Sequence, residues 1–543
     1  MTTHTIGGTI VDIVQGRMFR GSVRVEEGRI AAVTEEPAVG DGCIVPGLVD
    51  AHVHVESSML PPSSFAALAV VHGTVAAVAD PHEIANVLGI EGVRFMVDNA
   101  KQVPFKFLFG APSCVPATDF ETAGARLDAA AVAELLAMDG VGYLSEVMNF
   151  PGVLTGDPEV TAKVRLARER GLPVDGHAPG LMGDEARRYA AAGISTDHEC
   201  CTLEEARARI AAGMHVQIRE GSAARNFDAL LPLLAEHPDR VMFCSDDKHP
   251  DDLVTDHMDR LVRRAIAAGH DPLTVLRCCV LNPVRHYNLS VGMLQPGDPA
   301  DYLVVDNLES FRVLETRING VRVAEQGTSL IEPARVEPLN RFSAGPITEE
   351  DILVPRGPGK LRVMQALDGR LDTGSTTVEP TVRNGMVVSD PDRDLLKIVV
   401  LNRYGKARPA VGFVRGFGLR RGAVGSTVAH DSHNIIAVGD GDAEIVRAVN
   451  LVAEHRGGIS CVSDEGEGVL PLPLAGLMSL EDGHAVAARY REIDAMAKRA
   501  GASLAAPFMT LSFMALLVIP ELKLSDRGLF DGTVFSFTPL FTG

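Results

Sequence analysis

The alternation of strand-like and helix-like segments between residues 46 and 290 constrains the fold of this chain more than any other feature. Short apolar runs that end in polar residues alternate there with amphipathic segments, and they lie at 49–54, 75–82, 106–110, 143–146, 173–177, 195–198, 215–220 and 241–246. Eight such units predict an α/β fold with a (β/α)8 TIM-like barrel. Barrels of this type carry functional side chains at the C-terminal ends of their strands.

The segments on either side of the predicted barrel have the texture of β-structure. Residues 1–45 and 291–340 contain short β-rich runs broken by glycines, and Asn319-Gly320 is typical of a type I′ hairpin turn. We expect these two flanks to build one small β-sandwich together. The texture changes again after residue 340, which predicts a separate α/β or α+β domain over 341–543.

Composition excludes several classes of protein. The formal net charge of -20 argues against a nucleic-acid partner, because such binding depends on clustered Lys and Arg. The eight cysteines form no CxxC pair, which favours a reducing cytoplasm over a disulfide framework. We see no secretory signal at the N-terminus and no apolar run of about 18 residues that would cross a membrane.

The first predicted strand ends in a pair of histidines. The chain reads ValProGlyLeuValAspAlaHisValHis over 45–54, and His52 and His54 are two positions apart. Side chains at this spacing on a strand point to the same face, so both imidazoles can reach one metal ion. An HxH alone also occurs by chance on surface strands, so the interpretation depends on further ligands downstream.

Histidines and carboxylates stand at the ends of later predicted strands as well. Together with the HxH pair they form a candidate ligand set of six: His52, His54, Glu146, His177, His198 and Asp246. Six such groups exceed the need of one ion that keeps a position open for water, so they predict two metal ions with a shared ligand. The alternatives are buried structural histidines, a salt-bridged Glu146, and a helix N-cap role for Asp246 or Asp247.

The motifs around these residues resemble those of the amidohydrolase superfamily and, more narrowly, of the bacterial adenine deaminase family. They are HisValHisValGluSerSerMet, AlaAspProHisGluIleAlaAsn, GluValMetAsnPheProGlyVal, AspGlyHisAlaPro, ThrAspHisGluCys and SerAspAspLysHisPro, and the resemblance extends to ValAlaHisAspSerHisAsn near the C-terminus. It implies hydrolytic deamination of adenine to hypoxanthine and ammonia, with water activated by metal. It also implies that Glu146 bridges the metals, where many superfamily members use a carboxylated lysine.

The same resemblance implies cofactors and partners. We expect two divalent metal ions, Mn²⁺ or Fe²⁺ in the first place and Zn²⁺ as an alternative, with adenine as the small-molecule substrate. Proteins of this type often pair through large interfaces, so we expect a homodimer.

Candidate catalytic and binding residues lie at the same strand ends. Asp246 is the candidate proton carrier, because attack at C6 of adenine requires a base near the water. His82 and Glu83 are candidates for a hydrogen bond to the ring nitrogen that gains electrons, with a loop salt bridge as the alternative. Candidate purine-binding residues are Arg219, Glu220, Ser222, Glu199 and Ser57.

Two further features leave alternatives open. His430, Asp431 and His433 form a cluster in the last domain, which is read as a polar turn or a domain-interface network rather than as a second metal site or a lid. His54-Val55-Glu56 matches the first half of the HxE and PCxxC signature of a different zinc deaminase family, but the chain has no PCxxC. Other binuclear amidohydrolases, acting on a cyclic amide or an N-acyl substrate, share the predicted barrel, as would a scaffold protein without activity.

Overall fold

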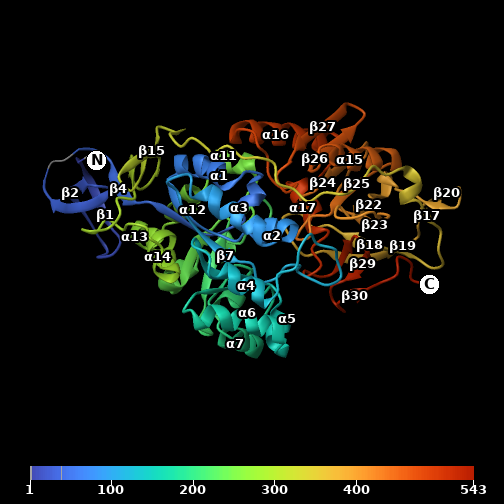
Figure 1. Cartoon of the computed structure of the whole chain (residues 1–543), viewed down its shortest axis with the longest axis horizontal. Coiled ribbons are helices and arrows are strands. Elements are labelled where there is room, and N and C mark those ends of the chain that lie inside the picture. The colour runs from blue at the N-terminus through green and yellow to red at the C-terminus, as the bar shows by residue number, and fades with distance from the viewer. Residues whose placement is uncertain (1–2, 38–39) are drawn as a thin grey trace.

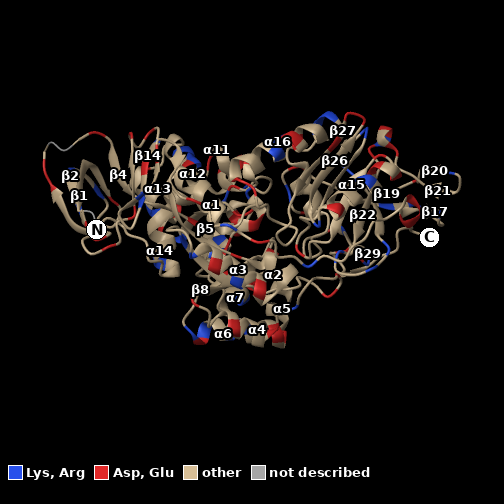
Figure 2. Ribbon diagram, turned by 45° about the horizontal axis from the view of Figure 1, so that its top comes forward, with Lys and Arg blue, Asp and Glu red and all other residues tan. Residues whose placement is uncertain are grey.

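The computed structural model describes residues 3–37 and 40–543 and shows three parts arranged along the long axis of the molecule (Figure 1). A β-sheet with the N-terminus lies at one end, a barrel lies in the middle, and the part that holds the C-terminus lies at the other end. Acidic residues are distributed over all three parts and are interspersed with Lys and Arg (Figure 2). Within the described residues no helix combines the length and the apolar character required to cross a bilayer.

Eight parallel strands form the barrel, and each one coincides with a predicted strand. They are β5 (Leu48–Val53), β6 (Thr74–Ala79), β7 (Lys106–Ala111), β8 (Val141–Val147), β9 (Val174–Gly176), β10 (Thr196–Asp197), β11 (His215–Arg219) and β12 (Val241–Cys244). β5 to β9 pair in order, as do β10 to β12. The ring closes where His54 N donates to Asp246 O at 3.2 Å and Asp246 N donates to His52 O at 2.9 Å. The predicted barrel is confirmed.

Local sequence signals place the helices around the barrel. Asp157 caps α6 (Pro158–Glu169) by accepting from the backbone N–H groups of Glu159 and Val160, and Thr202 forms a capping box with Glu205 at the start of α8 (Leu203–Ala211). The other outer helices include α1 (Pro62–Ala69), α3 (Ile90–Ala100), α4 (Ala129–Leu135), α7 (Gly183–Ala191), α12 (Met258–Ala267) and α14 (Asn282–Tyr287). β6 is buried along its whole length, as expected for a parallel strand that is covered on both faces.

The two flanks of the barrel join in one sheet, as predicted. Its eight strands follow the order β16 (Thr328–Ser329), β15 (Val321–Glu325), β14 (Val313–Ile318), β13 (Tyr302–Val305), β4 (Cys43–Pro46), β1 (His4–Asp12), β2 (Arg17–Glu26) and β3 (Arg29–Glu35). The first four come from the segment after the barrel. The flanks meet where β4 (Cys43–Pro46) pairs antiparallel with β13 (Tyr302–Val305). The predicted β-sandwich is therefore one continuous hydrogen-bonded sheet. Asn319 and Gly320 have φ values of 49° and 74°, which the type I′ turn requires.

The C-terminal part is built on a second eight-stranded sheet. Its strands follow the order β19 (Gly374–Val378), β18 (Leu361–Gln365), β23 (Ala410–Arg415), β22 (Leu396–Leu401), β25 (Ile435–Gly439), β24 (Ala423–Ser426), β26 (Gly458–Ser463) and β27 (Gly466–Pro471). Apart from the parallel pair β18 (Leu361–Gln365) and β23 (Ala410–Arg415), its neighbouring strands run antiparallel, which makes this part α+β. α15 (Asp442–Glu454) and α16 (Gly483–Arg499) accompany the sheet, and α17 (Pro507–Phe513) lies on the barrel side (Figure 1). The predicted domain boundaries themselves stay predictions.

The long loop that follows β7 connects the barrel to this C-terminal part. Thr122 N donates to Asp526 Oδ1 at 2.9 Å, and Asn434 Nδ2 donates to Thr122 O at the same distance. The Phe120 ring lies against Phe530, with ring centroids 4.9 Å apart. The loop and the C-terminal part therefore pack as one interface, which fixes the barrel mouth against the neighbouring domain.

Glu121 in this loop should make the stability of the protein depend on pH. Burial, with Asp431 and Asp526 adding to it, raises the pKa of Glu121 to about 8 from 4.5. The folded protein therefore holds a proton there that the unfolded chain releases above pH 4.5, so stability falls as pH rises from 4.5 to 8. Glu121→Gln should remove this loss, worth up to roughly 5 kcal/mol at about 1.4 kcal/mol per pKa unit.

The measurement is the free energy of unfolding of wild type and variant from pH 5 to 8.5. The matched control is Glu134→Gln in α4, since that glutamate is exposed. The advantage of Glu121→Gln over wild type should grow with pH, whereas Glu134→Gln should follow wild type. Parallel curves for all three proteins would contradict a neutral Glu121.

Candidate metal centre

The histidine pair at the end of β5 meets the carboxylate that follows β12. Nε2 of His52 and Nε2 of His54 are 3.2 Å apart, and Asp246 Oδ1 lies 3.3 Å from the His54 nitrogen and 3.7 Å from the His52 nitrogen. All three side chains are buried. Two imidazole nitrogens and a carboxylate oxygen thus face one point, which is the arrangement of a metal-binding group.

Glu146 on β8 lies between two groups of histidines. Its Oε2 is 2.8 Å from His177 Nδ1 and 3.0 Å from His198 Nε2, while its Oε1 is 3.6 Å from His54 Nε2. Burial alone would raise the pKa of Glu146, but the neighbouring His177 and His198 hold this pKa well below its usual range. An ionised carboxylate with one oxygen on each side can serve two ions at once.

Asp246 is held in place by its backbone and by a buried arginine. It adopts a left-handed conformation with φ 57°, which turns the chain out of β12. Arg219 Nη1 donates to Asp246 Oδ2 at 2.7 Å, and Arg219 Nη2 donates to Glu199 Oε2 at 3.0 Å. Arg219 thus uses these donors on two carboxylates, and its side chain also lines the cavity.

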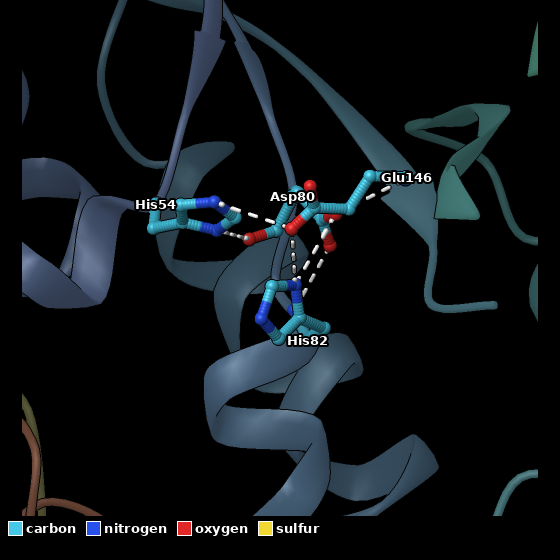
Figure 3. A group of neighbouring side chains, drawn as sticks. All are labelled: His54, Asp80, His82 and Glu146. Atoms are coloured by element: carbon cyan, nitrogen blue, oxygen red, sulfur yellow. Dashed lines mark hydrogen bonds and ion pairs between the residues drawn. The ribbon is translucent and has the colours of Figure 1, made fainter. Parts of the chain in front are cut away.

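The second barrel strand adds a group that the sequence analysis did not single out. Asp80 follows β6, and its Oδ2 lies 3.3 Å from Nδ1 of His82, the first residue of α2 (His82–Leu88). Figure 3 shows His54, Asp80, His82 and Glu146 converging from three strand ends, and His82 Nδ1 is 3.5 Å from Glu146 Oε1. The position of Asp80 at a strand end, two residues before His82, is the signal that could have identified it.

The predicted ligands, His82, Glu83, Glu199 and Arg219 come together at the barrel mouth, and three other predicted binding residues do not. Glu220 pairs with Arg264, and Ser222 Oγ donates to Asp252 Oδ2 at 2.6 Å. Ser57 is buried and donates to Asp247, whose own side chain lines the cavity. We therefore leave Glu220 and Ser222 out of the proposed site and assign Ser57 an indirect place through Asp247.

The C-terminal part closes the cavity from the other side. Its contribution is partly polar, from His430 and Asp431, and partly apolar, from Leu371, Phe513 and Leu516. Met148 of the barrel completes the apolar lining. The cluster of His430, Asp431 and His433 is thus a domain-interface network that also reaches the barrel mouth. The apolar residues carried no sequence signal, because only docking of the two parts brings them to the cavity.

The donor set suits a divalent metal. Two histidine Nε2 atoms facing each other at 3.2 Å cannot both carry hydrogen, and a shared cation resolves this contact. The ring nitrogens His52 Nδ1, His177 Nε2 and His198 Nδ1 are buried without a hydrogen-bond partner among the described residues. Burial, followed by the nearby His198 and His54, lowers the pKa of His52 to about 3, so this ring is neutral and able to donate a lone pair.

A parallel (β/α)8 barrel with histidines and carboxylates at its strand ends defines a metal-dependent hydrolase of the amidohydrolase class. The amidohydrolase family model matches residues 43–323, and this family implies the use of divalent metal. The model of the adenine deaminase C-terminal domain matches residues 370–536. Together with full-length relatives of that name at 54% and 52% identity, these matches show that the chain belongs to the adenine deaminase family.

Proteins from other organisms resemble the chain over its full length. A protein named adenine deaminase from Salinibacter ruber is 54% identical over 541 residues, covering 99% of both chains. One of the same name from Methanosarcina mazei is 52% identical over 98% of this chain and 99% of its own. A crystal structure of N-acetyl-D-glucosamine-6-phosphate deacetylase from Mycobacterium smegmatis covers 59% of this chain and 99% of its own, with 16% identity and a TM-score of 0.45.

Proposed function

We propose that the protein hydrolyses the exocyclic C–N bond of adenine and releases hypoxanthine and ammonia. The observation that carries this proposal is Glu146, whose two carboxylate oxygens face separate groups of histidines inside a cavity closed by the family's C-terminal domain. The apolar side chains of Met148, Phe513 and Leu516 suit the faces of a planar heterocycle, and the polar groups suit its edge.

We propose that six residues hold two divalent ions, with Glu146 as the shared ligand: His52, His54, Glu146, His177, His198 and Asp246. Imidazole and carboxylate donors accept Mn²⁺, Fe²⁺ and Zn²⁺. We propose Mn²⁺ or Fe²⁺ in the first place, as the resemblance to the family implies. When bound, the ions supply the Lewis acidity that makes water nucleophilic at neutral pH.

The side chains of the barrel then divide the proton transfers between them. Asp246 Oδ1 accepts a proton from the attacking water, while Arg219 holds the other carboxylate oxygen and so fixes the orientation of the base. The same carboxyl group returns the proton to the leaving amino group. Addition at C6 pushes electrons into the purine ring. His82 donates the hydrogen bond that stabilises the ring nitrogen, and the Glu83 carboxylate, whose Oε1 lies 3.4 Å from His82 Nε2, holds that imidazole in place.

The experiment that tests the function is ammonia release, with hypoxanthine formation, from purified protein supplied with Mn²⁺. The panel contains adenine, adenosine, a cyclic amide and an N-acyl sugar phosphate, because related barrels act on such compounds. Adenine should be the preferred substrate, as judged by kcat/KM. A higher kcat/KM on the cyclic amide or the N-acyl compound would overturn the proposal.

We also propose a cytoplasmic location and a homodimeric state. All eight cysteines are free thiols, and all of them except Cys201 are buried. Free thiols suit a reducing compartment. Light scattering of the purified protein would test the dimer by its mass.

A further inference from the structure

Two histidines of the C-terminal part lie against a carboxylate of the barrel. His430 and His433 stand in the turn between β24 (Ala423–Ser426) and β25 (Ile435–Gly439), and Glu83 is the second residue of α2. His430 Nδ1 is 2.6 Å from Glu83 Oε1, and His433 Nε2 contacts Glu83 Oε2. All three residues are at most 4% exposed. Both oxygens of the carboxylate are therefore contacted by residues from another domain.

The hydrogen-bond direction at His433 follows from its backbone contact. Ala429 N–H donates to His433 Nδ1 at 3.2 Å, so this ring nitrogen is the acceptor. In a neutral imidazole the hydrogen then sits on Nε2, the atom that faces Glu83. Burial lowers the pKa of His433 to about 4, which agrees with a neutral ring. The Nε2–H of His433 therefore lies against the carboxylate as a donor group, although Nε2 makes no regular hydrogen bond among the described residues.

Glu83 depends on these donors because its other surroundings are unfavourable to a carboxylate. Burial raises the pKa of the nearby Glu56 to about 7, and the negative charge of Glu83 adds to this rise. The ligand atoms of His82, Glu83 and Asp431 lie within 4.8 Å of one another, which brings a second carboxylate near. A buried carboxylate among other acids keeps its place only when strong donors hold it.

We propose that His430 and His433 are positioning residues that hold Glu83 at the barrel mouth, so that the C-terminal domain completes the catalytic site of the barrel. The inference rests on the proposed function, in which Glu83 acts on the purine ring through His82. It assigns the C-terminal domain a direct part in the chemistry, beyond covering the cavity. Neither histidine touches the substrate in this role; both act through the carboxylate.

Paired substitutions at each histidine distinguish the loss of the N–H donor from the loss of packing. His433→Leu removes the donor, whereas His433→Gln places an amide N–H near the position of Nε2. His430→Leu and His430→Asn make the same contrast at Nδ1. The Leu variants should lower kcat by about 10- to 100-fold, the effect of losing a hydrogen bond to a charged group, with KM and metal content near wild type. The Gln and Asn variants should recover most of kcat.

A double-mutant cycle tests whether the histidines act through Glu83. In a Glu83→Gln background, His433→Leu should cost little further activity, because the group that it positions is already lost. If the double variant instead loses kcat by the product of the two single effects, the inference is wrong. The control is His484→Leu at the exposed start of α16, which should keep wild-type kcat. Thermal unfolding of each variant shows whether it is folded.

A readout independent of activity separates this inference from the proposed function. Nitrogen-15 NMR of histidine-labelled protein, with His433→Gln used for assignment, should show the Nε2–H tautomer at His433. A protonated Nδ1 would overturn the inference whatever the substrate. If wild type releases no ammonia from adenine while the tautomer is Nε2–H, the proposed function fails and the positioning of Glu83 stands.

Discussion

Replacing Asp246 with asparagine should lower kcat for adenine by about 10³- to 10⁴-fold, at the upper end of what a general acid or base contributes. The amide keeps the shape of the side chain and one oxygen, but it cannot accept the proton of the attacking water. Metal content should stay at the wild-type level, because the histidines and Glu146 remain. Turnover and metal analysis of the same preparation check the two expectations together.

The substitution is well suited to the backbone at this position. Asp246 has φ 57°, a left-handed conformation that asparagine tolerates better than most residues, so the turn after β12 should survive. The matched control is Asp239→Asn, an exposed aspartate just before the opposite end of the same strand. It removes the same charge and should leave kcat unchanged. Wild-type turnover in Asp246→Asn would remove this residue from the proposed mechanism.

The barrel could be predicted because each of its strands carries a local signal. Runs such as ThrValAlaAlaValAla in β6 are apolar on both faces, and helices with caps such as Asp157 and Thr202 separate them. The candidate ligands followed from the same analysis, since the C-terminal ends of all barrel strands meet at one mouth. The distances around Glu146 agree with that expectation.

The positions of Glu220 and Ser222 could not be predicted from the periodicity of the strand. Alternation along β11 points Arg219 into the barrel and therefore directs Glu220 outward, toward Arg264 of α12. β11 ends at Arg219, and an isolated bridge between Glu220 and Arg225 marks a tight turn. Residues beyond the strand end no longer follow its period, so Ser222 could not be placed from spacing alone.

The part of the site that comes from the C-terminal domain could not be predicted for a different reason. His430, Leu371 and Phe513 reach the cavity only because two separately built units dock through the loop after β7. Docking depends on the complementarity of whole surfaces, which no local pattern in the chain encodes. The sequence therefore indicated a polar cluster in that domain without indicating what it would face.

Replacing Glu146 with glutamine should have the largest effect on metal binding. One end of the amide keeps an oxygen, but the other carries an NH₂ group that cannot bind a cation, so the residue can no longer serve two ions. We expect metal content to fall from two ions per chain to one or fewer, and kcat for adenine to fall by at least about 10³-fold with the loss of metal catalysis. Elemental analysis of protein grown in defined medium measures the first effect.

Glu83→Gln is the matched control for this experiment. It makes the same chemical change at another buried glutamate of the cavity, 2% exposed, that lies outside the proposed ligand set. It should lose activity but retain both ions, because its carboxylate is held by His430 and His433. Two ions per chain in Glu146→Gln would refute the bridging role, and loss of metal in Glu83→Gln would extend the ligand set toward the C-terminal domain.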